Sequence, residues 1–307
     1  MRIAVIGAGG VGGYFGGRLA QAGHDVTFVA RGRHLAALRE RGLTIESARG
    51  NATVAAASAT DDPAALAPCD IVMFCVKLWD VESAAQRIAP LVAGGGAVIP
   101  FQNGLDAPEI LKRVLGPQSV LGGVAYIAAT IRVAGVIAHT GTMARLVVGA
   151  FDGGNAHAAV AFRDACVAAG IDADLSADIR RTLWEKFCFL SALSGSTALA
   201  RQPLGVVRGD PDLRAAFESA TREAWSLGRA RGVPLADDYV ARQLAALDTL
   251  PAEMRSSMLN DLVAGNRLEA PWLSGAVARM AAESGMAAPV SATFYAAVKP
   301  YLNGAPH

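Results

Sequence analysis

Short apolar runs alternate with helical patterns along the first half of the chain. Residues 2–6 are rich in β-branched side chains, which predicts a strand, and a helical pattern follows over residues 10–22. A second strand is expected at 26–30 and a second helical stretch around 34–41. Further strands are expected at residues 71–77, 97–101, 120–127 and 146–150. Strands that alternate with helices predict parallel βαβ units and a doubly wound sheet.

The second half of the chain has a different pattern. From about residue 179 the periodicity is helical, and prolines stand at plausible helix starts and breaks. We therefore place a boundary near residue 175, in the polar segment 171–178, which gives an α/β domain over 1–175 and a helical domain over 176–307. Two such domains predict a small-molecule site in a cleft between them.

Composition excludes several classes of protein. Of 307 residues, 52% are hydrophobic and 18% charged, which excludes a disordered chain. Lys and Arg number 28 against 27 acidic residues, and no stretch has the basic density of a nucleic-acid-binding surface. The four cysteines lack metal-ligand spacing and lie in apolar runs, so we expect buried free thiols, a reducing compartment and no metal site.

The apolar runs are too short for a membrane protein. None approaches the roughly 18 residues that a spanning helix needs. Met1 and Arg2 followed by an apolar run imitate a signal peptide, but seven glycines between residues 7 and 17 disfavour a translocating helix. We expect a cytoplasmic protein without a membrane partner.

A glycine-rich turn follows the first expected strand and opens the first helix. It runs Gly7-Ala8-Gly9-Gly10-Val11-Gly12, which matches the G-x-G-x-x-G pattern of dinucleotide-binding sites in a Rossmann-type fold. Gly7 permits the tight turn, Gly9 lets the backbone approach a pyrophosphate, and Gly12 lets the helix pack on the strand. The alternative is a purely structural glycine turn, but the strand and helix on either side favour a dinucleotide.

The end of the second strand distinguishes NADP from NAD. An NAD site needs Asp or Glu there for the ribose hydroxyl, and this chain has no acid but Arg31 and Arg33. Two guanidinium groups can bind a 2′-phosphate, so NADP is expected. The alternative is that both arginines are ordinary surface residues.

Polar residues follow two later strands. Lys77 ends the apolar run 71–77, and Asn103-Gly104 follows the run 97–101, at the sheet edge where ligands bind in doubly wound folds. Lys77 equally fits a lysine that reaches solvent, and Asn-Gly is a strong turn signal. A turn does not prevent Asn103 from facing a nicotinamide.

Three features of the second half carry candidate chemistry. Lys186 lies in Trp184-Glu185-Lys186-Phe187, which opens a mostly apolar helix, and a lysine of lowered pKa there can protonate a developing alkoxide. A lysine that extends to solvent is the more common case. Glu269 precedes Pro271, and Ser256-Ser257 fit a helix N-cap.

Taken together, these segments resemble the ketopantoate reductase (2-dehydropantoate 2-reductase) family over nearly the whole chain. The glycine loop is common to many families. The ordered series that follows it is more specific: Cys75-Val76-Lys77, Gln102-Asn103-Gly104, Trp184-Glu185-Lys186, and Ser256-Ser257-Met258 with Asp261 and Glu269.

The resemblance implies NADPH-dependent reduction of 2-dehydropantoate to pantoate, in pantothenate and coenzyme A biosynthesis. It implies a Rossmann-type domain followed by a helical domain like the C-terminal domain of 6-phosphogluconate dehydrogenase. Lys186 would be the general acid, with Glu269 orienting it and the substrate. Lys77 and Asn103 would contact cofactor and substrate, and Ser257 would bind the substrate carboxylate.

One departure bears on the substrate. The family usually has asparagines four and eight residues after the catalytic lysine, and this chain has Leu190 and Ser194. These positions share a helix face with Lys186, so we expect them to line the substrate site. Loss of an amide removes a hydrogen-bond donor and an acceptor, and the preferred keto acid can differ as a result.

Two alternatives stay open at this point. One is a related reductase of a more apolar 2-keto or β-keto acid, since 3-hydroxyacid and opine dehydrogenases share this architecture. The other is an NADP-binding sensor without turnover, which the joint presence of Lys77, Asn103, Lys186 and Glu269 disfavours. The sequence leaves the oligomeric state open, a homodimer included.

Overall fold

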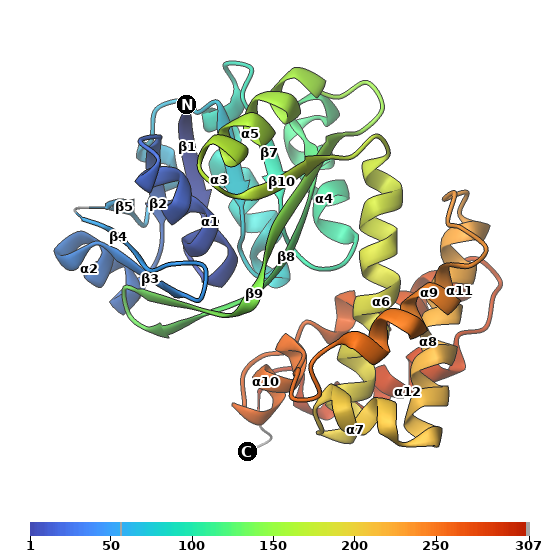
Figure 1. Cartoon of the computed structure of the whole chain (residues 1–307). Helices are drawn as coiled ribbons and strands as arrows, with labels where there is room; N and C mark the ends of the chain where they lie inside the picture. Colours follow the sequence, from blue (N-terminus) through green and yellow to red (C-terminus); the bar gives the residue numbers. More distant parts are fainter. Residues whose placement is uncertain (56, 305–307) are drawn as a thin grey trace. The chain divides into compact units, whose positions relative to one another are not determined.

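The computed structural model describes residues 1–55 and 57–304, which divide into two compact units (Figure 1). The first unit contains residues 1–102 and 106–179. The second contains residues 103–105 together with the chain from Arg180 onward. The short segment Asn103–Leu105 therefore belongs with the helical unit, although the first unit flanks it on both sides in the sequence.

The first unit contains a five-stranded parallel sheet in the order β5-β2-β1-β6-β7. Its strands are β1 (Arg2–Ile6), β2 (Asp25–Val29), β5 (Ser58–Thr60), β6 (Ile71–Phe74) and β7 (Ala97–Pro100). The central strand β1 pairs with β2 on one side and β6 on the other. From β1 the chain first adds strands on the β2 side of the sheet and later adds β6 and β7 on the other side. A doubly wound fold binds its ligands at this switch point beside β1. The expected Rossmann-type α/β fold is confirmed.

A second sheet corrects the expectation that all the strands are parallel. Its strands are β3 (Leu43–Ser47), β4 (Ala52–Val54), β8 (Leu121–Val133), β9 (Val136–Ala150) and β10 (Asp172–Leu175). β8 and β9 are longer than the apolar runs 120–127 and 146–150, and they pair antiparallel as a hairpin. Hairpin strands can extend beyond an apolar run because their outer parts face solvent and carry polar residues.

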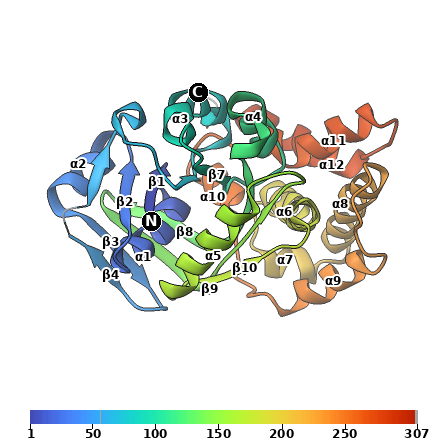
Figure 2. The same ribbon diagram turned by 90° about the horizontal axis from the view of Figure 1, so that it is seen from above.

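Helix α1 (Gly10–Gln21) lies between the two sheets, as Figures 1 and 2 show. A Cβ on Gly16 would lie 2.7 Å from Val5 in the first sheet, and a Cβ on Gly17 would lie 2.7 Å from Ile45 in the second. A Cβ on Gly13 would lie 2.8 Å from Ile137, also in the second sheet. The glycines in this helix therefore let it approach both sheets closely, which offsets their low helix propensity.

Other helices complete the first unit. They are α2 (Gly32–Arg41), α3 (Val81–Val92), α4 (Asp106–Leu115) and α5 (Ala156–Ala168), with 3₁₀ turns at η1 (Pro63–Ala65), η2 (Leu78–Asp80) and η3 (Pro117–Ser119). The core that they share with both sheets is apolar and includes Phe15, Phe28 and Phe162, all without exposed surface. Each of these aromatic side chains buries a large apolar area, which stabilises the core.

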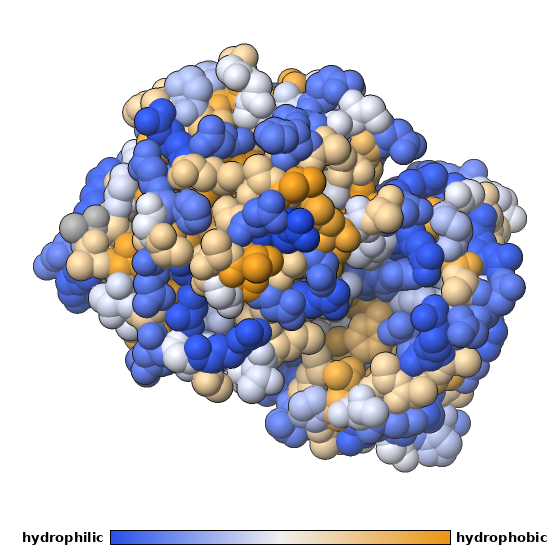
Figure 3. Space-filling view, turned by 45° about the horizontal axis from the view of Figure 1, so that its top comes forward, coloured by the Kyte–Doolittle hydropathy of each residue, from blue (hydrophilic) through white to orange (hydrophobic). Residues whose placement is uncertain are grey.

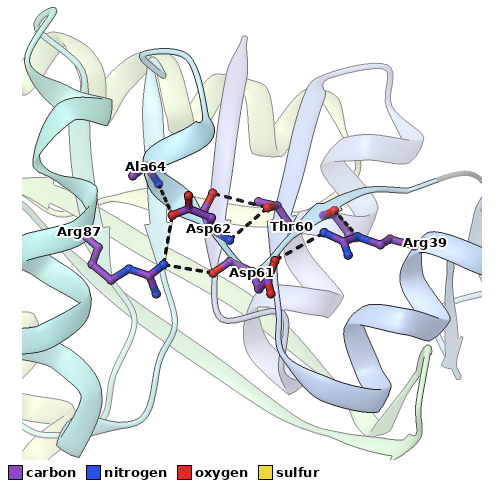
Figure 4. A network of polar contacts seen from close by, with 7 residues as sticks. Arg39, Thr60, Asp61, Asp62, Ala64 and Arg87 are labelled. Carbon is purple, nitrogen blue, oxygen red and sulfur yellow. Dashed lines mark hydrogen bonds and ion pairs between the residues drawn. The ribbon is translucent and has the colours of Figure 1, made fainter.

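Charged side chains hold the loop after β5 to α2 and α3 (Figure 4). Arg39 of α2 lies 3.5 Å from Asp61, and Arg87 of α3 lies 3.1 Å from Asp62. Asp62 also accepts a hydrogen bond of 3.1 Å from the Ala64 N–H and so caps η1. Exposed pairs of this kind are individually weak, and the Arg39 pair is the one that joins this loop to α2, the helix that follows Arg31.

The second unit is helical, which confirms the pattern seen in the sequence. Its elements are α6 (Ile179–Ala200), α7 (Leu204–Gly209), α8 (Pro211–Ala230), α9 (Tyr239–Thr249), α10 (Ser257–Val263), η4 (Ala270–Trp272), α11 (Ser274–Glu283), α12 (Pro289–Val298) and η5 (Lys299–Tyr301). The long helix α6 contributes to several apolar clusters, with Phe187 in one, Leu193 in the next and Ala198 in a third. Glu223 of α8 accepts the N–H groups of Val290 and Ser291, each at 2.8 Å, and so fixes the start of α12.

The four cysteines are free thiols, as the sequence predicted. Cys69, Cys166 and Cys188 are buried and Cys75 is half-buried, all as free thiols. Burial raises the pKa of Cys166 to about 12, so this thiol is unreactive. The face drawn in Figure 3 intersperses hydrophilic and hydrophobic residues. Over residues 1–55 and 57–304, no helix is long and apolar enough to span a membrane.

Candidate functional site

The loops that follow β1, β2, β6 and β7 carry most of the candidate residues in the first half of the chain. The four strands are adjacent and parallel, so their carboxyl ends lie along one edge of the sheet. The glycine loop follows β1, Arg31 follows β2, and Lys77 follows β6. This is the edge at which open α/β sheets bind dinucleotides.

The glycine loop has the geometry of a phosphate-binding turn. Gly7 has φ +98°, and a Cβ there would lie 2.8 Å from the Cys75 carbonyl, so residue 7 must be glycine. A Cβ on Gly12 would lie 2.3 Å from the Gly7 oxygen. A Cβ on Gly9 would meet nothing within 4 Å, so its missing side chain leaves open space. Open space at Gly9 beside the uncapped start of α1 fits a bound pyrophosphate.

Gly10 has a structural role that its sequence position does not reveal. A Cβ on Gly10 would lie 1.9 Å from the Ala129 oxygen of β8. Gly10 therefore allows the second sheet to approach the loop. Val11, the next residue, is half-buried in the first turn of α1. Its N–H group is among the four that start a helix without an intrahelical acceptor and are suited to an anion.

Arg31 precedes α2 and is exposed, with a guanidinium nitrogen 3.5 Å from a carboxylate oxygen of Asp80. Asp80 belongs to η2, after β6. This pairing was not expected from the sequence, because the two residues are distant along the chain. Arg33 is also exposed. A guanidinium beside the end of β2 fits a 2′-phosphate.

Lys77 lies beyond the strand and does not end it, which corrects the expected bounds 71–77. β6 stops at Phe74, and Lys77 is an exposed residue that precedes η2. Its ammonium nitrogen is 5.6 Å from the centre of the Trp79 ring. The strand is shorter because Cys75 and Val76 pass the Gly7 turn at close range, where a Cβ on Gly7 would meet both.

Gln102 is a candidate that reasoning on individual residues missed. Its side-chain amide donates to the carbonyl oxygens of Phe74 at 3.0 Å and Val76 at 2.9 Å, and so joins the ends of β6 and β7. Among the residues that the structure describes, Gln102 Oε1 is one of three buried side-chain oxygen atoms without a hydrogen-bond partner. A buried acceptor without a partner is costly, and a ligand donor can satisfy it.

The helical unit brings Asn103 and Lys186 together. The Lys186 ammonium donates to the Asn103 Oδ1 over 2.9 Å. Lys186 lies in the second turn of α6, and Asn103 lies on the short segment that belongs with this unit. Gly104 has φ +87°, so the expected Asn-Gly turn is present, and a Cβ there would lie 2.8 Å from the Trp272 oxygen. The turn therefore packs against η4, which follows Glu269.

The electrostatics of Lys186 suit an acid. Burial lowers its pKa from 10.5 to about 8, and the Glu269 carboxylate opposes this shift. A lysine with a pKa near 8 is still mostly protonated at neutral pH, but it releases its proton far more readily than an exposed lysine. Three of the expected residues, Asn103, Lys186 and Glu269, thus form one interacting group.

Leu190 and Ser194 do not both lie open to a ligand. Leu190 is half-buried and packs against two apolar clusters of the helical unit. Ser194 has no exposed surface, and its hydroxyl has no hydrogen-bond partner among the described residues. That both line the substrate site stays a prediction, and in this structure Ser194 has no surface that a substrate can touch.

Ser256 and Ser257 separate into two roles. Ser256 is buried and caps α10 by accepting the Leu259 N–H at 3.0 Å, which confirms the expected N-cap. Its hydroxyl is 2.7 Å from that of Thr197 in α6. Ser257 is the exposed first residue of α10. Its expected contact with a substrate carboxylate stays a prediction, while the Thr197–Ser256 pair fixes its position.

Two family descriptions match the chain. "Ketopantoate reductase PanE/ApbA" matches residues 3–153, and "Ketopantoate reductase PanE/ApbA C terminal" matches residues 178–302. Among curated relatives, a 2-dehydropantoate 2-reductase of Halobacterium salinarum is 32% identical, covering 95% of this chain and 96% of its own. An uncharacterized oxidoreductase of Bacillus subtilis, YkpB, is 30% identical, covering 98% and 99%.

Solved structures agree with this result. The 2-dehydropantoate 2-reductase of Geobacter metallireducens has a TM-score of 0.91 and 28% identity, covering 97% of this chain and 99% of its own. A D-mandelate dehydrogenase, described with NADH and anilino(oxo)acetate, has a TM-score of 0.90 at 19% identity, with 98% of both chains covered. At that identity the likeness shows the fold alone. The N-terminal and C-terminal family descriptions both match this chain, and the chain covers nearly the full length of its curated relatives. The chain therefore belongs to the ketopantoate reductase family of oxidoreductases.

Proposed function

We propose that this protein reduces 2-dehydropantoate to pantoate with NADPH, the reaction expected from its sequence. The observation that carries this proposal is the group formed by Lys186, Asn103 and Glu269, in which a lysine of lowered pKa is held by an amide and faces a carboxylate. Family membership supports the reaction class. In this proposal residues 1–175 bind the cofactor and residues 176–307 carry the catalytic acid.

The cofactor is NADP(H) in this proposal, and it supplies a hydride when bound. The backbone of residues 7–12 holds the pyrophosphate, with the open space at Gly9 and the start of α1 directed to it. Arg31 would bind the 2′-phosphate, and Lys77 and Asn103 would each contact the cofactor. The Gln102 Oε1, which has no partner among the described residues, would be available to accept a hydrogen bond from the cofactor.

Lys186 supplies the proton. The substrate ketone becomes an alkoxide as hydride reaches C2, and the Lys186 ammonium donates its proton to that oxygen, which gives the hydroxyl. Lys186 then takes a proton from water. The Asn103 Oδ1 orients the ammonium at 2.9 Å, and the Glu269 carboxylate favours its protonated form. The positive charge also attracts an anionic keto acid, whose carboxylate Ser257 binds in this proposal.

One observation favours a second substrate class. Leu190 packs in apolar clusters at a position where the family usually has an amide. A pocket without that amide loses selectivity for a substrate hydroxyl and favours a more apolar keto acid. The D-mandelate dehydrogenase of the same fold has mandelate in its name, so phenylglyoxylate, the keto acid of mandelate, is the natural test compound.

The test follows NADPH absorbance with purified protein and three keto acids. 2-Dehydropantoate is the expected substrate, 2-ketoisovalerate lacks its hydroxymethyl group, and phenylglyoxylate is the apolar alternative. Turnover of 2-dehydropantoate at least tenfold faster than of the others supports the proposal. Preference for phenylglyoxylate supports the second class. Tight NADPH binding without turnover of any keto acid rejects both and favours a sensor.

A further inference from the structure

His34 joins the glycine loop to a turn of the second sheet. His34 is half-buried in the first turn of α2, and its Nε2 lies 2.8 Å from the Ala8 carbonyl oxygen. The Gly135 N–H donates to its Nδ1 over 3.0 Å. Gly135 lies between β8 and β9, 101 residues from His34 in sequence. One imidazole ring therefore connects the dinucleotide loop, α2 and the β8–β9 hairpin.

The two hydrogen bonds assign the proton on the ring. A backbone N–H can only donate, so Nδ1 is the acceptor for Gly135 and carries no hydrogen. Nε2 must then carry the hydrogen and donate it to the Ala8 carbonyl. Burial lowers the pKa of His34, and the bond to Ala8 acts in the opposite direction. The neutral ring with hydrogen on Nε2 is the form that satisfies both partners.

The bond to Ala8 fixes the peptide plane that follows it. In a trans peptide the carbonyl of one residue and the N–H of the next point in opposite directions, and the described residues contain no cis peptide. With the Ala8 carbonyl held by His34, the Gly9 N–H is directed away from the His34 ring. The residues before this peptide are also fixed, because the N–H groups of Gly7 and Ala8 both donate to the Val29 carbonyl at 3.1 Å.

The support behind His34 is itself fixed. The Gly135 carbonyl accepts the Thr44 N–H at 2.9 Å, which holds the hairpin turn to β3. The hairpin also touches the loop directly, because Gly10 lies so close to the Ala129 carbonyl that a Cβ would be 1.9 Å from it. The hairpin that supports His34 is therefore itself held in place by two backbone contacts, one to β3 and one to the glycine loop.

We propose that His34 is a positioning residue of the dinucleotide site, which holds the Ala8 carbonyl and thereby directs the Gly9 N–H toward the pyrophosphate. This inference rests on the proposed binding of NADP(H). His34 acts through the backbone of the loop and on the part of the cofactor that NADPH and NADH share. Its loss therefore weakens both cofactors alike, in contrast to the loss of Arg31.

Two substitutions separate the two bonds of the ring. In His34→Gln the side-chain amide reaches the place of Nε2 and can still donate to Ala8, but the acceptor for Gly135 is lost. In His34→Asn the shorter amide keeps an acceptor at the place of Nδ1 and loses the reach to Ala8. His157→Asn, on the exposed surface of α5, is the control for a histidine removed elsewhere in the unit.

The first measurement is the dissociation constant for NADPH and for NADH, by titration of nicotinamide fluorescence. We expect His34→Asn to weaken both cofactors about 3- to 12-fold, the effect of one lost hydrogen bond. His34→Gln and His157→Asn should stay within about twofold of the unmodified protein. Equal binding by His34→Asn, or equal weakening by both His34 variants, overturns the inference.

Amide hydrogen exchange without cofactor gives the second readout. His34→Asn should speed exchange in the peptide that covers residues 8–10 and leave the one that covers Gly135 protected. His34→Gln should do the reverse. Exchange that rises over the whole first unit in both variants shows a general packing role and overturns the inference. If the unmodified protein binds neither dinucleotide, the proposed function fails, and this inference fails with it.

Discussion

The Lys186 ammonium lies 2.9 Å from the Asn103 amide oxygen, although 83 residues separate the two in sequence. The amide orients the ammonium without adding a negative charge. A carboxylate in its place would hold the proton more tightly and raise the pKa of the lysine. Burial instead lowers this pKa to about 8, and the Glu269 carboxylate limits the shift. The group is therefore suited to proton donation at neutral pH.

The first prediction tests Lys186 as the proton donor. Lys186→Met should lower the rate of keto acid reduction by about 10²- to 10⁴-fold, the usual contribution of a general acid. NADPH binding, which this residue does not carry in the proposal, should change less than threefold, as measured by fluorescence titration. Lys299→Met, at an exposed lysine of the same unit, is the control. A loss of activity below tenfold would remove Lys186 from the mechanism.

The second prediction concerns pH. Reduction requires protonated Lys186, so kcat/KM should be level below about pH 8 and fall as pH rises through that value. Glu269 raises the pKa of Lys186, so Glu269→Gln should move this fall to lower pH. The measurement is kcat/KM for 2-dehydropantoate from pH 6 to 10. A fall that does not move, or moves upward, would contradict the pairing of these two residues.

The third prediction tests cofactor choice. Arg31→Ala should weaken NADPH by at least about tenfold, because a charge-assisted contact with the 2′-phosphate is lost, and should leave NADH nearly unchanged. Asp80 lies 3.5 Å from Arg31 and repels a phosphate, so Asp80→Asn should leave NADPH binding equal or tighter. Both constants come from fluorescence titration. Equal losses for NADPH and NADH in Arg31→Ala would reject the NADP assignment.

The sequence predicted those features that depend on short stretches of chain. The glycine turn, the strand before it and the N-cap at Ser256 are all local, and they are present in the structure. The pairing of β8 with β9 was not predicted, because the register of a hairpin depends on contacts beyond its apolar runs. The parallel pairing of β9 with β3 was not predicted either, because it joins segments that lie far apart in the sequence.

The same limit applies to the site. Arg31, Lys77 and Asn103 could be chosen because each follows a strand of one parallel sheet. The bonds of His34, Gln102 and Thr197 could not, because each joins segments that the sequence places far apart. A histidine or threonine in an otherwise ordinary helix gives no signal of its partner. Only the folded chain shows that these side chains support the loops that carry the chemistry.

The fourth prediction concerns Leu190. Leu190→Asn restores the amide that the family usually has, but it places that amide among two apolar clusters. We expect a loss of unfolding free energy of about 1–3 kcal/mol, the usual cost of a buried amide without a partner. Leu199→Asn, at an exposed position of the same helix, should cost less than about 0.5 kcal/mol. Urea denaturation measures both.

The activity of Leu190→Asn then reports on the pocket. If the side chain reaches the substrate, the ratio of kcat/KM for 2-dehydropantoate to that for 2-ketoisovalerate should rise, because the new amide can bind the substrate hydroxyl. An unchanged ratio beside the expected loss of stability would assign Leu190 to packing alone.

The last prediction uses two adjacent glycines to separate binding from folding. A Cβ on Gly9 meets nothing within 4 Å, and its φ of −74° suits alanine, so Gly9→Ala should keep the melting temperature within about 2 °C. The added methyl group occupies the space assigned to the pyrophosphate and should weaken NADPH and NADH alike, by tenfold or more. Gly10→Ala places its Cβ 1.9 Å from the Ala129 oxygen and should destabilise the fold strongly. Thermal denaturation and fluorescence titration distinguish the two, and normal cofactor binding by a folded Gly9→Ala protein would show that the pyrophosphate lies elsewhere.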